Sequence, residues 1–163
     1  MNTFTWTMGH LDMAATSKIV HSKQFRKSSI ARDELISRAE RAIDNMREEF
    51  GTWMEDEVAS LTSVMAAWLA APTDEDVSGE LYRRGHDLKG QAATLGFPIV
   101  GRIAASLCEL LTAEQISQSN RITLARSHVN AIRAAVRDEV RDDTDETAKA
   151  LATELEAAVA RFL

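Results

Sequence analysis

Apolar residues recur at steps of three and four along most of the chain, which is the spacing of one face of an α-helix. The clearest run extends from Asp33 to Ala71, and Pro72, which cannot continue a helix, ends it. Because Gly51 interrupts the run, the pattern predicts one long helix or two nearly collinear helices. The apolar positions of this stripe, with both tryptophans expected in the core, are Leu35, Ala39, Ile43, Met46, Phe50, Trp53, Val58, Leu61, Met65 and Trp68.

The next helix is predicted from about Asp74 to Leu95, with Thr73 as its N-cap and acidic residues in its first turn. Gly96 and Phe97 then form a tight connection, and Pro98 suits the first turn of a following helix. That helix fades near residue 112, and residues 113–120 are polar and read as a loop. Two further apolar series predict a helix over 122–140 and, after the capping pair Asp143 and Glu146, a last helix that carries Leu151, Leu155, Val159 and Phe162.

No segment alternates apolar and polar residues as a β-strand would. The fold class is therefore predicted to be all-α: an up-down antiparallel four-helix bundle with additional N-terminal and C-terminal helical extensions. We interpret residues 1–30 as a basic, flexible extension and residues 31–163 as a single bundle domain with its motif core at 73–112.

The chain is acidic, with a formal net charge of −6, which argues against a general nucleic-acid binder. Only the first 30 residues are basic, with four lysines or arginines against Asp12; docking to an acidic partner and a short extra helix are the alternatives to a flexible extension. A single cysteine, Cys108, favours the reducing cytoplasm and is read as a buried structural thiol. No apolar run is long enough to cross a membrane.

The stretch from Gly85 to Gly90 (Gly-His-Asp-Leu-Lys-Gly) carries the candidate chemistry. On a helix, the apolar residues around it gather on one face, and His86 points roughly 140° away from the centre of that face. The core face comprises Leu81, Gly85, Leu88, Ala92 and Leu95. The neighbours of the histidine on the outer surface are Gly79, Tyr82, Arg83, Lys89, Gly90 and Ala93.

Glycine inside a helix lowers its stability by about 1 kcal/mol relative to alanine, so we expect each of these glycines to have a structural or functional role. Gly85 faces the core and allows a neighbouring helix to approach, whereas Gly90 faces outward and leaves room for a partner beside His86. Lys89 and Arg83, one turn to either side, disfavour the charged imidazolium. A neutral imidazole beside positive charge suits a nucleophile that accepts a phosphoryl group, whose oxygens Lys89 can neutralise.

A lone histidine on a helix is most often a solvated side chain, and it is the spacing of its neighbours that favours a functional one. The run from His86 to Gly96 resembles the signature of histidine-containing phosphotransfer (HPt) domains, in which lysine follows the histidine at +3 and glycine at +4 and +10. His86, Lys89, Gly90 and Gly96 match these positions. Gln91 stands where many members of the family have a small residue.

The resemblance implies that His86 is phosphorylated on the ring nitrogen distal to the backbone and exchanges the phosphoryl group with a receiver-domain aspartate. Response-regulator receivers and a hybrid or chemotaxis-type histidine kinase are the implied partners. The magnesium ion belongs to the receiver, so no cofactor or metal is expected in this chain. The residues expected to contact the partner are Gly79, Tyr82, Arg83, Gly90, Gln91 and Ala93, with Gly85 and Gly96 in structural roles.

Other chemistry finds less support. His10, His21 and His128 lack metal-ligand spacing, and His128, inside a long helix beside Val129, is expected at the boundary between core and surface. No glycine-rich phosphate loop is present, so the chain is expected to carry phosphate without being an ATP-dependent kinase. Two alternatives to a monomeric cytoplasmic relay protein stay open: a helical adaptor that binds a receiver or kinase without transfer, and a helical enzyme or metal protein that uses His86.

Overall fold

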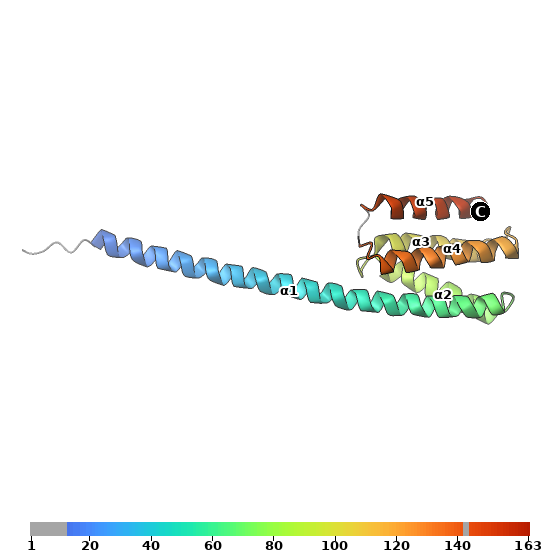
Figure 1. The fold of residues 1–163 in the computed structure, drawn as a ribbon, viewed down its shortest axis with the longest axis horizontal. Coiled ribbons are helices and arrows are strands. Elements are labelled where there is room, and N and C mark those ends of the chain that lie inside the picture. Colours follow the sequence, from blue (N-terminus) through green and yellow to red (C-terminus); the bar gives the residue numbers. More distant parts are fainter. Residues whose placement is uncertain (1–12, 142–143) are drawn as a thin grey trace, which may run out of the picture. The chain divides into compact units, whose positions relative to one another are not determined.

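The computed structural model describes the backbone of residues 13–141 and 144–163, and side chains from residue 32 onward. The described residues form five helices and no strand (Figure 1). The helices are α1 (Met13–Ala70), α2 (Glu75–Gln91), α3 (Pro98–Thr112), α4 (Gln118–Arg137) and α5 (Glu146–Ala160). The all-α prediction is thereby confirmed.

The chain divides into two units, Met1–Asp44 and Asn45–Leu163. The predicted start of the first helix at Asp33 is wrong, because α1 begins at Met13. In the first unit the apolar side chains of Leu35, Ile36 and Ile43 are exposed to solvent, so they do not extend the core. The predicted boundary between residues 30 and 31 stays a prediction, and Trp6, His10 and His21 lie outside the described side chains.

The second unit is a helical bundle in which residues 45–70 of α1 join α2, α3 and α4, with α5 packed against α3 and α4 (Figure 1). Nine residues of the apolar helix α3 are buried, so α3 is the centre of the unit. The residues that α1 contributes to the core recur at helical spacing: Met54, Val58, Leu61, Met65 and Trp68.

Trp53 corrects the prediction that both tryptophans of the stripe are core residues. Its side chain is 55% exposed and lies against Phe50, with 5.8 Å between the ring centroids. At about 100° per residue, position 53 lies roughly 100° from the centre of the face that carries Met54, Val58 and Leu61. Towards the N-terminal end of α1, the residues of the predicted stripe therefore no longer lie on the buried face of the helix.

The helix ends show which polar residues act as caps. Asp74, rather than the predicted Thr73, caps α2, because its carboxylate accepts hydrogen bonds from the backbone N–H groups of Asp76 and Val77. Asp145 caps α5 in the same way, and the predicted cap Asp143 lies outside the described residues. Helix α3 has its predicted bounds. Helix α4 covers residues 118–137 instead of the predicted 122–140, so it begins four residues earlier than predicted.

Helix α1 continues through Gly51, and the side chain of Arg141 occupies the space beside this glycine. The guanidinium of Arg141 donates a hydrogen bond to the carbonyl of Arg47, 3.2 Å away, and lies 4.6 Å from the ring centroid of Phe97. A Cβ atom at position 51 would come within 2.8 Å of Nη2 of Arg141. Gly51 therefore allows the connection after α4 to be fastened to α1.

His128 is fully buried, which corrects its predicted place at the boundary between core and surface. Its Nδ1 lies 2.7 Å from the carbonyl oxygen of Leu124, and its Nε2 lies 3.0 Å from the hydroxyl of the buried Ser106. Since a carbonyl only accepts, Nδ1 carries the proton and Nε2 accepts the hydroxyl proton of Ser106. Burial lowers the pKa of His128 below its ordinary value, outweighing the opposite effect of the Leu124 carbonyl.

The Gly51→Ala substitution is expected to have different effects with and without Arg141. In an ordinary helix interior it stabilises by about 1 kcal/mol. Here the new methyl group displaces the guanidinium, so the gain is smaller in the parent chain and reaches its full size in the Arg141→Ala background. Urea unfolding of the four chains measures the coupling, and equal gains in both backgrounds would contradict this interpretation of Gly51.

The buried imidazole predicts a loss of stability in acid. The unfolded chain takes up a proton on His128 near pH 6.5, whereas the folded chain resists protonation. The free energy of unfolding should therefore fall as the pH drops below about 6.5, and His128→Gln should make this fall shallower. Urea unfolding between pH 8 and pH 5 gives both curves, and the same pH dependence in the two chains would refute the prediction.

Candidate functional site

The orientation of α2 follows from one buried stripe. Leu81, Gly85 and Leu88 are buried on this helix, and Ala92 and Leu95 continue the stripe beyond its regular end. All five are the residues expected on the core face. A surface on the opposite side of the helix is thereby held facing solvent.

Gly85 allows α2 to lie close to α3. A Cβ atom at this position would be 3.3 Å from Sγ of Cys108 and 3.7 Å from a methyl carbon of Leu107. Gly101 of α3 makes the reciprocal approach, because its Cβ would lie 3.6 Å from the carbonyl oxygen of Lys89. The two helices meet through glycine from each side, directly beneath the segment that carries the histidine.

The His86 side chain is 61% exposed. Its ring lies alongside that of Tyr82, one turn earlier, with 6.1 Å between centroids and 29° between planes. The carboxylate of Asp87 lies 3.9 Å from Nδ1, which is beyond hydrogen-bond length. Within the described part of the chain no hydrogen bond holds either ring nitrogen, so the imidazole is accessible to a partner.

Of the two cations predicted to flank the histidine, one is already engaged. Glu80 binds the guanidinium of Arg83 at 2.6 Å and that of Arg84 at 2.9 Å, and these bonds lower the pKa of Glu80. Sequence reasoning missed Glu80, although its spacing of three and four residues is the usual one for helical ion pairs. The Lys89 side chain is exposed and makes no salt bridge with the described residues.

The remaining predicted contact residues differ in exposure and in their position around the helix axis. Gly90 is exposed, and a Cβ atom there would meet nothing within 4 Å, so packing inside this chain does not require a glycine. Gly79 is half-buried and lies near the Arg83 guanidinium. Tyr82, Gln91 and Ala93 are also exposed, and at about 100° per residue Gln91 lies roughly 140° from His86 around the helix axis.

Gly96 closes the C-terminal end of this helical segment. It has a φ of +86°, a left-handed conformation that favours glycine. The Phe97 N–H donates to the carbonyl of Ala92 at 2.7 Å, and the Gly96 N–H donates to that of Ala93 at 3.2 Å, the two bonds of a Schellman motif. The regular helix ends at Gln91, short of the predicted Leu95, because these bonds tighten the last turn.

Other potential chemistry is limited in the part of the chain that the structure describes. Burial raises the pKa of the Cys108 thiol, which disfavours the reactive thiolate. No group of three or more histidine, cysteine, aspartate or glutamate side chains in this part is arranged to hold a metal ion. None of the described helices is both long and apolar enough to span a bilayer.

Comparison with known protein families gives one match, in which the Hpt domain family covers residues 32–161. No curated protein and no solved structure matches the chain. The matched region contains all of α2 to α5 and the exposed histidine, and the all-helical fold agrees with that of the family. The chain therefore belongs to the Hpt domain family, whose role is phosphotransfer in two-component signalling.

Proposed function

We propose that His86 accepts a phosphoryl group from a receiver-domain aspartate and returns it to one, without any ATP-dependent kinase activity in this chain. The observation that carries the proposal is an exposed imidazole with no internal hydrogen bond, on a helix whose opposite face is fixed in the core. An imidazole buried in the fold, such as that of His128, could not meet a second protein.

In the proposed step, the Nε2 lone pair of His86 attacks the phosphorus of the aspartyl phosphate, a new N–P bond forms, and the P–O bond to the aspartate breaks. The aspartate leaves as a carboxylate, and Nδ1 keeps its proton throughout. The Asp87 carboxylate, 3.9 Å from Nδ1, favours the tautomer that leaves Nε2 free. The reverse reaction uses the same groups.

Lys89 supports this step through its charge. An ammonium that has no carboxylate partner among the described residues is available to the phosphoryl oxygens. The magnesium ion that assists at the aspartate belongs to the receiver, so this chain supplies a nucleophile and a positive charge only. Positioning and charge stabilisation account for most of the catalysis in phosphoryl transfer, and two docked proteins can share them.

Gly90 provides the approach, and its neighbours provide the contact surface. Tyr82, Gln91 and Ala93 are exposed and would contact the receiver, together with Gly79 and Arg83. The open space above Gly90 allows the receiver backbone to reach the imidazole. In this proposal the chain works as a monomer in the cytoplasm, where it meets its receiver and a hybrid or chemotaxis-type kinase.

His86→Gln should abolish phosphoryl transfer while leaving the fold intact, because glutamine keeps a polar side chain at an exposed position but has no nucleophilic nitrogen. The measurement is transfer of radiolabel from a panel of phosphorylated receiver domains, with circular dichroism as the check on folding. Persistent labelling of the folded variant would overturn the assignment of His86. Binding of a receiver by both chains without labelling of either would identify a non-transferring adaptor.

Gly90→Leu should slow transfer tenfold or more without destabilising the bundle. The new side chain meets open space in the free protein and favours helix, so stability should be kept or raised by up to about 1 kcal/mol. It would, however, occupy the space that a docked receiver needs. Ala157→Leu, which adds bulk at an exposed position of α5, is the matched control and should transfer normally. Equal transfer rates for both variants would remove this role of Gly90.

A further inference from the structure

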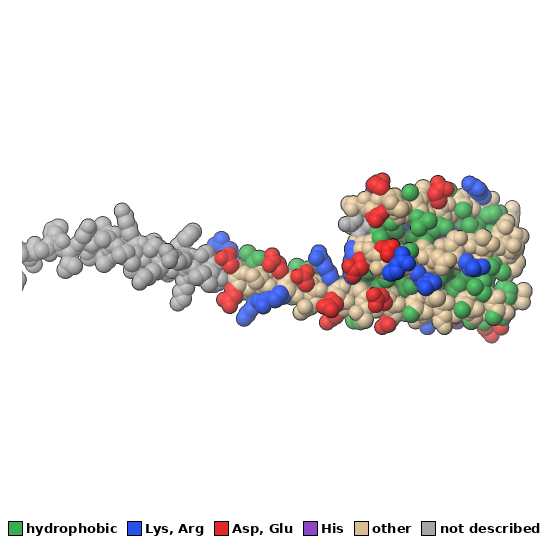
Figure 2. Space-filling view, viewed as in Figure 1, with side chains coloured by type: hydrophobic (Ala, Val, Ile, Leu, Met, Phe, Trp, Pro, Cys, Tyr) green, Lys and Arg blue, Asp and Glu red, His purple; other side chains and the backbone are tan. Residues whose placement is uncertain are grey.

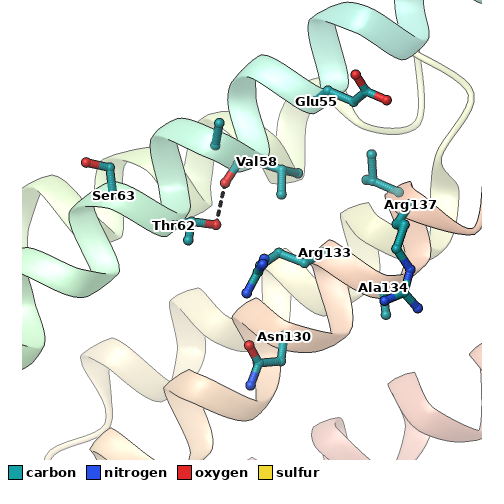
Figure 3. A pocket seen from close by; sticks show the side chains of 10 residues that line it. Glu55, Val58, Thr62, Ser63, Asn130, Arg133, Ala134 and Arg137 are labelled. Atoms are coloured by element: carbon teal, nitrogen blue, oxygen red, sulfur yellow. Dashed lines mark hydrogen bonds between the residues drawn. The ribbon is translucent and has the colours of Figure 1, made fainter.

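A groove runs between α1 and α4 in the second unit, on a surface that no residue of α2 lines. Its wider part has a volume of about 890 Å³ (Figure 3). A second hollow continues it towards Leu69 and shares Thr62, Asn130 and Arg133 with the first. From Glu55 to Leu69 the groove follows about 20 Å of α1, the length of a four-turn helix.

The groove exists because small side chains face it from both helices. Ala59, Ser63 and Ala66 line it from α1, and Ala134 lines it from α4. The Thr62 hydroxyl donates to the carbonyl of Val58 within its own helix, at 2.7 Å, so its proton is already used (Figure 3). Val58 and Val129 form the buried apolar floor.

One wall of this apolar groove is positively charged. Arg126, Arg133 and Arg137 follow one another along α4, and Figure 2 shows basic side chains beside apolar ones over this helix. Arg137 pairs with Asp138 at 2.8 Å. Arg126 and Arg133 have no carboxylate partner in the described part of the chain, although the chain as a whole has a net charge of −6. An occupant with carboxylates would complement this wall.

The same molecule shows how such a groove is filled. Helix α5 packs against α3 and α4 and buries Ala152, Leu155 and Val159 there. At the edge of this contact, Glu156 of α5 binds the Arg102 guanidinium of α3 through two hydrogen bonds, of 2.7 and 3.1 Å. Helix α5 thus shows that a groove of this bundle with an arginine at its edge can be covered by a helix that has a stripe of apolar residues and a carboxylate beside it.

We infer that the α1–α4 groove is a second interaction surface, which binds an acidic amphipathic helix of a partner protein. The apolar stripe of that helix would cover Val58 and Val129, and its carboxylates would pair with Arg126 and Arg133. Since α2 does not line the groove, the surface is separate from the one proposed for phosphoryl transfer. A partner could hold the chain here while a receiver approaches His86.

The probes for this inference are two fluorescent synthetic peptides with the same leucine and alanine stripe, flanked by glutamates in one and by lysines in the other. Fluorescence anisotropy with the full chain should show binding of the glutamate peptide and at least tenfold weaker binding of the lysine peptide. The double substitution Arg126→Glu and Arg133→Glu should weaken the glutamate peptide tenfold or more, and Ala59→Trp, which fills the groove, should do the same. Both variants should still be labelled on His86.

The matched control is Arg161→Glu, which changes the charge at an exposed position at the end of α5, outside the groove. This variant should bind the glutamate peptide like the parent chain. Failure of the parent chain to bind that peptide would overturn the inference, as would equal weakening by Arg161→Glu or equal affinity for the two peptides. Binding of the parent chain to anionic lipid vesicles instead of the peptide would likewise overturn it.

Discussion

The close approach of α2 to α3 is the contact on which the functional surface depends. Gly85 lies against Cys108 and Leu107, and Leu81 and Leu88 are fully buried on the same side. A Cβ atom at position 85 would lie 3.3 Å from Sγ of Cys108. Either α2 or the Cys108 side chain would then have to move. Because this face is fixed, the opposite face of the helix, with His86, is fixed as well.

Part of this arrangement could be predicted from the sequence because it follows from helical periodicity. The core face of α2 and the outward direction of His86 need only the angle per residue, and the bounds of α3 follow from Pro98 and the loss of apolar residues after residue 112. These features are local, so the pattern of residues along the chain determines them.

Other features depend on contacts between distant segments, which periodicity does not reveal. Arg141 explains why α1 has a glycine at position 51, and the two residues are far apart in sequence. His128 is buried because Ser106 of α3 meets its second nitrogen. Near the site, the pairing of Arg83 with Glu80 leaves Lys89 as the cation that the described ion pairs do not engage. The sequence alone does not show which of the nearby cations Glu80 binds.

The role of His86 can be tested directly by a long-range proton–nitrogen NMR spectrum of the histidine rings, recorded before and after exposure to a phosphorylated receiver that labels the chain. We expect that only the signals of His86 change, with the shift at Nε2, while the buried ring of His128 keeps its hydrogen bonds and its signals. A phosphorylated nitrogen on His10, His21 or His128, with the His86 signals unchanged, would contradict this role.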